Sequence, residues 1–228
     1  GEAAGCQTAP APLCAFVHCH SGGRKMSKPP SEALARKFHA ALAAINAGDP
    51  RQAERLLKGI LDKAPGQFEA LMMLGTLHGQ QSRFDKAASM FERAVRSRPG
   101  EAGAHFNLGL ARSRLGMKDE AIARYRRTLE LVPGHLEALN NLGSELIASG
   151  RWDDALSALR QALALHPRDG RLLNNLGFAQ LESGDADGAI ESFSRALAVS
   201  ASNSEIHTNL GLAFQKTGRR DQAIAEFR

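Results

Sequence analysis

The feature that most constrains the fold of this 228-residue chain is a repeat with a period of 34 residues. Prolines recur at that spacing, at Pro65, Pro99, Pro133 and Pro167. Aligned on them, units begin at residues 34, 68, 102, 136, 170 and 204, so that five units are complete and the sixth is truncated. A period of this length predicts small structural units that bury their apolar faces only by stacking on one another.

Each unit repeats the same alternation of small and large residues. The seventh and eighth positions are Leu and Gly in five units, at Leu74-Gly75, Leu108-Gly109, Leu142-Gly143, Leu176-Gly177 and Leu210-Gly211. The twentieth position is always Ala, at Ala53, Ala87, Ala121, Ala155, Ala189 and Ala223, and the twenty-fourth is bulky, at Leu57, Phe91, Tyr125, Leu159, Phe193 and Phe227. We expect the glycine to admit a neighbouring backbone at close range. We expect the small and large positions to interdigitate each unit with the next.

The middle of each unit carries turn signals. Glycines suited to a left-handed residue after a helix recur at Gly116, Gly150, Gly184 and Gly218. Aspartates follow three residues later, at Asp119, Asp153, Asp187 and Asp221, where an acidic side chain favours the start of a second helix. Each unit is therefore predicted to be a helix, a tight turn and a second helix.

These columns resemble the tetratricopeptide repeat (TPR) family, over residues 34–228. The resemblance implies an all-α fold, a right-handed α-α superhelix of five complete repeats and a truncated sixth. We expect the solenoid to occupy residues 31–228. The first unit departs most, with Ala40 and Ala41 in place of Leu-Gly, as suits a terminal unit with one neighbour.

Residues 1–30 lack this periodicity, and we expect them to be a disordered leader. Met26 opens a segment that runs directly into the first periodic helix, so we hypothesise that residues 1–25 are not native. At the other end, Arg228 falls inside a second helix. We expect the natural chain to continue, because a stop there would expose Leu210, Ala223 and Phe227.

Composition argues against several classes of function. The net charge of +5 arises from scattered Lys and Arg among nearly as many acids, so we expect no nucleic-acid partner. No apolar run is long enough to span a bilayer, and we expect no membrane association. All three cysteines precede residue 20, which favours a reducing, cytoplasmic location. Cys14, His18, Cys19 and His20 lack a second ligand pair, so we expect neither a metal site nor a cofactor.

The candidate site is a column of asparagines. In the TPR family the sixth position of each unit faces the concave groove, and here it reads Met73, Asn107, Asn141, Asn175 and Asn209, with Asn140 and Asn174 beside two of them. A carboxamide can donate to and accept from a peptide backbone. The alternative is that these side chains contact their neighbours in the next unit and only keep the groove hydrated.

The column is similar to the one in the TPR region of O-linked N-acetylglucosamine transferases and of related bacterial repeat proteins. That resemblance implies that Asn107, Asn141, Asn175 and Asn209 hold the backbone of an extended peptide. A carboxylate clamp needs Lys or Arg at inward second and sixth positions, but the second positions read Glu69, Gly103, Glu137, Arg171 and Glu205 and the sixth are mostly asparagine, so we expect no clamp. We therefore expect a scaffold that binds protein segments in its groove and has no catalytic residues. The alternative function is the substrate-recognition arm of a similar glycosyltransferase, whose catalytic domain would lie beyond residue 228.

Overall fold

The computed structural model describes residues 32–228, and within that range it contains twelve α-helices and no strand. They are α1 (Glu32–Asn46), α2 (Pro50–Leu61), α3 (Phe68–Gln80), α4 (Phe84–Ser97), α5 (Ala102–Arg114), α6 (Lys118–Leu131), α7 (Leu136–Ala148), α8 (Trp152–Leu165), α9 (Gly170–Ser183), α10 (Ala186–Val199), α11 (Ser204–Lys216) and α12 (Arg220–Glu226). The predictions for the leader and its three cysteines lie outside the described residues.

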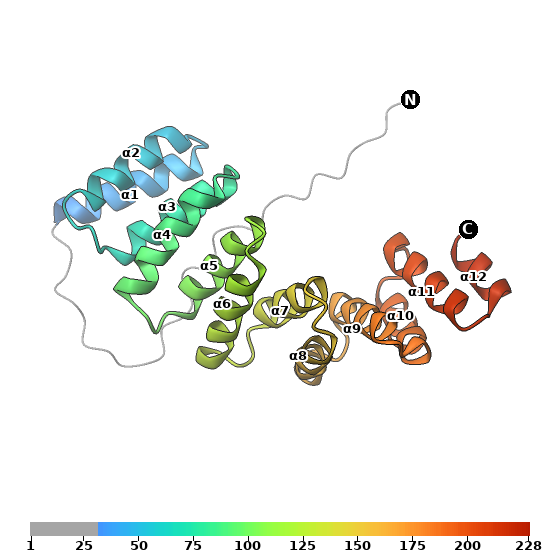
Figure 1. Ribbon diagram of the computed structural model, residues 1–228. Coiled ribbons are helices and arrows are strands. Elements are labelled where there is room, and N and C mark those ends of the chain that lie inside the picture. The colour runs from blue at the N-terminus through green and yellow to red at the C-terminus, as the bar shows by residue number, and fades with distance from the viewer. Residues whose placement is uncertain (1–31) are drawn as a thin grey trace, which may run out of the picture.

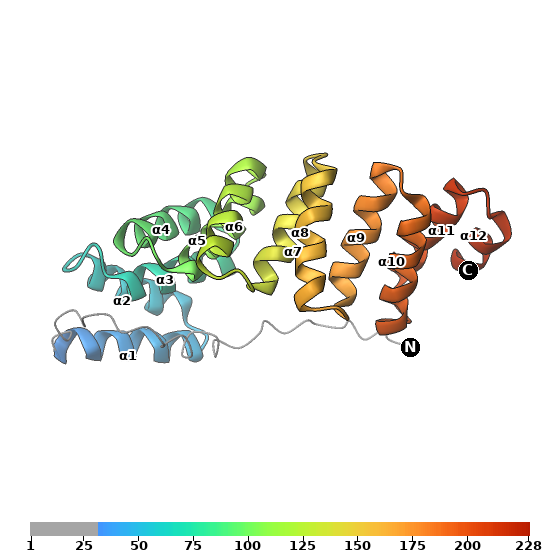
Figure 2. The same cartoon turned by 90° about the horizontal axis from the view of Figure 1, so that it is seen from below.

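Each odd-numbered helix packs against the even-numbered helix that follows it, and the six pairs succeed one another along an arc (Figures 1 and 2). Helices α3, α5, α7, α9 and α11 begin at residues 68, 102, 136, 170 and 204, which are the unit starts of the 34-residue register. The predicted all-α solenoid of helix pairs is confirmed.

The turns within the pairs have the predicted conformation. The glycines at residues 116, 150, 184 and 218 have φ values between 69° and 96°. The same position holds Gly48 in the first unit and Ser82 in the second, and Ser82 is also left-handed, with φ of 57°. Every unit therefore closes its first helix with a left-handed residue, even where that residue has a side chain.

The glycines at the eighth position are packed differently from our expectation. A Cβ added to Gly75, Gly109, Gly143, Gly177 or Gly211 would lie 2.5–2.7 Å from the side chain at the twenty-fourth position of the same unit. The prediction that a neighbouring backbone approaches this glycine is therefore wrong. The bulky side chain of the second helix lies across the first helix, so the small and large positions interlock within a unit.

The apolar core consists of two clusters. One extends from Ala41 to Ala111 and includes α1–α5, and the other extends from Ala121 to Ala223 and includes α6–α12. The division falls between the two helices of the third unit. At the end of the described chain Leu210 and Ala223 are buried, contrary to our expectation, because α11 packs against α10 and α12 covers α11. Phe227 is half-exposed, as expected.

Candidate functional site

The odd-numbered helices form the tighter side of the arc. Helix α3 contacts α5, α7 contacts α9, and α9 contacts α11, whereas even-numbered helices make no comparable contact with one another among the described residues. We call the surface of these helices the odd-helix face. Because helices crowd together on the inner side of a curved stack, the odd-helix face is the concave side.

On this face, asparagines link successive units. Asn175 donates from Nδ2 to Asn140 Oδ1 over 2.9 Å and to Ser144 Oγ over 3.2 Å. One unit further on, Asn209 Nδ2 donates to Asn174 Oδ1 over 3.1 Å. In both cases the sixth position of one unit donates to the fifth position of the preceding unit. We call these two contacts the asparagine bridges.

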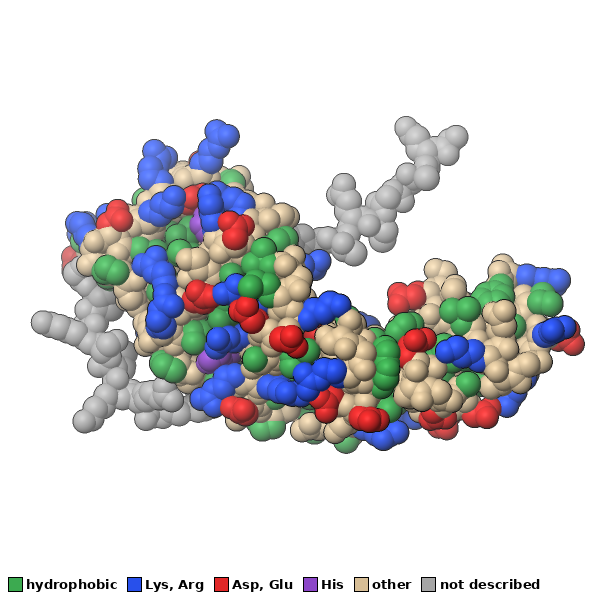
Figure 3. Space-filling model, viewed as in Figure 1, with side chains coloured by type: hydrophobic (Ala, Val, Ile, Leu, Met, Phe, Trp, Pro, Cys, Tyr) green, Lys and Arg blue, Asp and Glu red, His purple; other side chains and the backbone are tan. Residues whose placement is uncertain are grey.

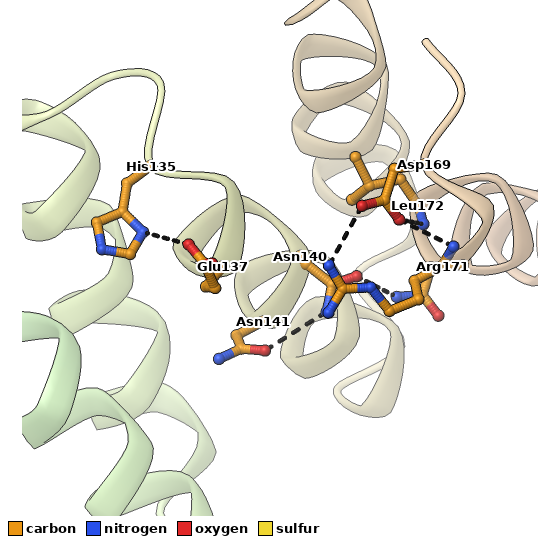
Figure 4. A network of polar contacts seen from close by, with 8 residues as sticks. His135, Glu137, Asn140, Asn141, Asp169, Arg171 and Leu172 are labelled. Carbon is orange, nitrogen blue, oxygen red and sulfur yellow. Dashed lines mark hydrogen bonds and ion pairs between the residues drawn. The ribbon is translucent and has the colours of Figure 1, made fainter. Parts of the chain in front are cut away.

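The bridges are limited to the C-terminal half of the face. Asn141 would meet Phe106 at the fifth position of the preceding unit, and Asn107 would meet Met72. Neither side chain offers a carbonyl acceptor. Asn141 instead accepts a long hydrogen bond of 3.5 Å from its own neighbour, Asn140 (Figure 4). Asn107 has no side-chain hydrogen bond within residues 32–228.

The structure therefore brings together four of the six predicted side chains in bridges, places Asn141 beside one of them, and leaves Asn107 apart. Contacts between asparagines of neighbouring units are what the alternative interpretation expected, but sequence reasoning did not identify the pairing of fifth with sixth positions. The signal was present in the two Asn-Asn doublets, 140–141 and 174–175, which are 34 residues apart.

The capping of α9 accounts for the one basic residue at a second position. Asp169 accepts hydrogen bonds from the backbone N–H groups of Arg171 and Leu172, and its carboxylate pairs with the Arg171 guanidinium at 3.2 Å (Figure 4). Partial burial acts to raise the pKa of Asp169, but these hydrogen bonds outweigh it and lower the pKa. The Arg171 guanidinium is thus already paired with Asp169, the residue that caps the start of its own helix.

Between α5 and α7 the odd-helix face opens. The contact between these two helices is weaker than the contacts between α7 and α9 and between α9 and α11, although Ser113 of α5 donates a hydrogen bond to Glu145 of α7. A cavity of about 420 Å³ lies there, lined by Leu110, Ser113, Arg114, Tyr125, Asn141, Ser144 and Glu145. Phe106 stacks against His135 with ring centroids 4.7 Å apart, on the same junction.

Tyr125 brings a hydroxyl to this cavity from α6. Its side chain is 1% exposed, and its ring lies against Gly109 of α5. Burial raises the pKa of Tyr125 to about 12, and the nearby Glu145 carboxylate adds to the shift, while hydrogen bonds with Asn141 and Ser113 oppose it. Ser113 Oγ also donates to Glu145 Oε1. The hydroxyl therefore stays protonated at neutral pH.

The two histidines at the fourth position of their units have structural partners. His105 Nε2 lies 2.9 Å from the Pro99 carbonyl and His207 Nε2 lies 3.0 Å from the Ala201 carbonyl, so each ties a helix to the turn before it. Burial lowers the pKa of His105. Within the described range, no three His, Cys, Asp or Glu side chains lie close enough to share a metal ion.

Charges are mixed over the surface. On the face drawn in Figure 3, acidic side chains are interspersed among the basic ones. Two of the three arginines of α6 are paired, Arg126 with Asp154 at 3.1 Å and Arg127 with Glu130 at 2.6 Å. None of the helices described here is both long and apolar enough to span a bilayer.

Comparison with known proteins places these features in a family. A tetratricopeptide repeat model matches residues 38–78, 72–135 and 140–205, and a second such model matches residues 204–228. No curated protein matched the sequence.

Three solved structures illustrate the likeness in fold. The MamA protein superposes with a TM-score of 0.72 at 23% identity, over 77% of this chain and 96% of MamA. A tetratricopeptide repeat protein from Parabacteroides merdae gives 0.76 at 18% identity, over 86% and 78% of the two chains. YrrB, described as a TPR protein with an unusual peptide-binding site, gives 0.65 at 16% identity, over 75% and 88%. Together with the helix pairs and their 34-residue register, the match of the family models shows that the chain belongs to the tetratricopeptide repeat family.

Proposed function

We propose that the odd-helix face holds an extended segment of a partner protein and that the asparagine column contacts its main chain. The contacting residues are Asn107, Asn140, Asn141, Asn174, Asn175 and Asn209. Membership of the TPR family supports this proposal, and so does the peptide-binding site ascribed to YrrB. The same groove would serve a free-standing scaffold or the substrate-holding arm of a longer enzyme.

The observation that carries the proposal is the geometry of the asparagine bridges. Asn175 uses Nδ2 for two hydrogen bonds, and Asn209 uses Nδ2 for one. Their Oδ1 atoms accept no hydrogen bond from any residue in the described range. Successive units thus offer similar neutral acceptors on a concave surface. Such groups suit backbone N–H donors, which an extended peptide presents whatever its side chains.

Two cations on this face are already engaged, which favours backbone contacts over capture of a terminal carboxylate at their positions. Arg171 pairs with Asp169 at 3.2 Å. Lys216 Nζ donates to the Leu181 carbonyl over 3.2 Å and lies 3.7 Å from Glu182. A carboxylate clamp needs basic groups free to meet the ligand.

Asn107 offers the sharpest test, because its side chain makes no hydrogen bond that the substitution would remove from the folded protein. The full chain is used to select binders from a displayed library of random peptides, and their affinities are then measured for Asn107→Ala. Loss of one hydrogen bond predicts affinities weaker by roughly 3- to 10-fold.

The matched control is Gln161→Ala, which removes an exposed carboxamide from α8, outside the odd-helix face. It should leave affinity unchanged. The proposal fails if no peptide is selected by the wild-type chain, or if both variants bind as tightly as wild type.

A further inference from the structure

The junction between the third and fourth units differs from the two later junctions in the side chain that faces the sixth-position asparagine. At the two following junctions an asparagine bridge closes the odd-helix face. Here the side chain that meets Asn141 is Tyr125, and a cavity of about 420 Å³ remains between α5 and α7. This volume is within the range of about 300–1,000 Å³ typical of ligand pockets.

Tyr125 is the only tyrosine of the chain, and it occupies a position that is Leu or Phe in the other five units. The side chain at this position lies across the glycine of the first helix in units two to six. Where the residue at this position is Phe or Leu, only carbon atoms extend past the glycine to the far side of the first helix. With Tyr125 it delivers a hydroxyl to the lining of the cavity.

The cavity contains one carboxylate, that of Glu145. Glu145 is partly buried, accepts from the Ser113 hydroxyl, and has no ion-pair partner among residues 32–228. A carboxylate shielded from water is stabilised by a cation that reaches it. The Tyr125 oxygen and Asn141 Oδ1 supply further acceptors, and Leu110 supplies an apolar surface. Ser144 is occupied by its bonds to Asn140 and Asn175.

One cation of the protein itself lines the same cavity. Arg114 is exposed, and it makes no ion pair in the described part of the chain. Its charge reaches the site, where it acts to lower the pKa of Tyr125, but an exposed guanidinium on a long side chain can turn into solvent when a second cation enters. Glu145 is less exposed, so its carboxylate has lost part of its hydration on folding. A cationic ligand can replace that lost hydration.

We propose that this cavity is a specificity pocket that takes one lysine or arginine side chain of the bound segment, with its cationic head on Glu145 and its methylene stem along Leu110. The inference rests on the proposed function, since the side chain belongs to a segment held along the odd-helix face. Backbone contacts hold any extended segment, whereas this pocket selects among them.

The experiment uses the full chain and paired peptides that differ at one position. Each peptide selected from the random library is resynthesised with norleucine in place of each lysine, or of each arginine, in turn. At the position that enters the cavity, wild type should prefer the basic residue roughly tenfold. Glu145→Gln should abolish that preference and leave the affinity for the norleucine peptide unchanged. Tyr125→Phe, which reproduces the residue of the second, fifth and sixth units, should reduce the preference for the basic residue.

The control variant is Glu191→Gln, on the exposed surface of α10. It should retain the full preference. The pocket is refuted if Glu145→Gln retains the preference for the basic residue, or if wild type shows no such preference. In either case, binding of the norleucine peptides leaves the proposed function standing.

A probe that does not depend on peptide selection completes the test. Nα-acetyl-lysine N-methylamide and its norleucine analogue are titrated into the isotopically labelled chain. The lysine derivative alone should shift the amide resonances of Ser113, Ser144 and Glu145. An unchanged spectrum, or equal shifts with both compounds, contradicts the pocket.

Discussion

Ser82 shows how strongly the repeat constrains a single residue. It occupies the turn position that is glycine in the other five units, and it adopts φ of 57° there. A left-handed conformation costs a residue with a Cβ roughly 1–2 kcal/mol, a penalty that glycine avoids at the expense of greater freedom in the unfolded chain. Ser82 is held in this conformation by the helices on either side.

We predict that Ser82→Gly raises the free energy of unfolding by about 0.5–1 kcal/mol. Urea denaturation monitored by circular dichroism measures the change. The reciprocal substitution Gly116→Ser is the control, because no atom lies within 4 Å of a Cβ at Gly116 and the cost arises from the backbone alone. It should lower stability by a similar amount, and a gain from Gly116→Ser would disprove the argument.

At the scale of the residue, the sequence predicts the left-handed conformation of the turn glycines, because glycine is the residue type suited to the conformation that this helix end requires. It does not predict Ser82 from its type, since serine has no preference for positive φ. Only the place of Ser82 in the 34-residue period indicates its conformation.

At the scale of the helix pair, the decisive contact is between the eighth and twenty-fourth positions. The sequence shows that one is small and the other large, but spacing along the chain does not determine which helices bring them together. The rotation of each helix about its own axis decides which helices bring the two positions together. In the fifth unit Phe193 is fully buried, and its Cε1 lies 2.7 Å from where a Cβ of Gly177 would be.

We predict that Gly177→Ala destabilises the protein by about 1–3 kcal/mol, because the buried ring has no space into which to move. Gly103→Ala is the matched control. Gly103 also lies in an odd-numbered helix, but nothing lies within 4 Å of its added Cβ, so the change should gain up to about 1 kcal/mol from helix propensity. Thermal unfolding distinguishes the two variants, and similar effects of both would refute the packing described here.

At the scale of the whole molecule, the two core clusters divide the chain between α5 and α6. The sequence predicts a continuous stack, because all six units carry the same columns. It does not predict the division, nor the cavity, which depends on the side chains that one junction brings together, Tyr125 and Glu145 among them. In a solenoid each unit contacts only its neighbours, so stability is distributed locally.

We predict that a cavity in the first cluster weakens that cluster alone. Leu57 is fully buried in α2, and Leu57→Ala should lower the free energy of local opening in α1–α3 by about 2–5 kcal/mol. Hydrogen exchange monitored by mass spectrometry should show unchanged protection in α9–α11. Leu172→Ala, in α9, is the reciprocal variant, and a uniform loss of protection from either would indicate a single cooperative unit.

The asparagine bridges also have a mechanical consequence. They join the odd-numbered helices from α7 to α11, whereas the helices before them are joined by no such bridge in the described chain. We therefore expect the surface from α7 to α11 to resist a change of curvature more than the surface from α1 to α5, where no side-chain hydrogen bond joins successive odd-numbered helices of the described chain. Partners of different width could then be accommodated at the N-terminal end, while the C-terminal end aligns all of them in the same register.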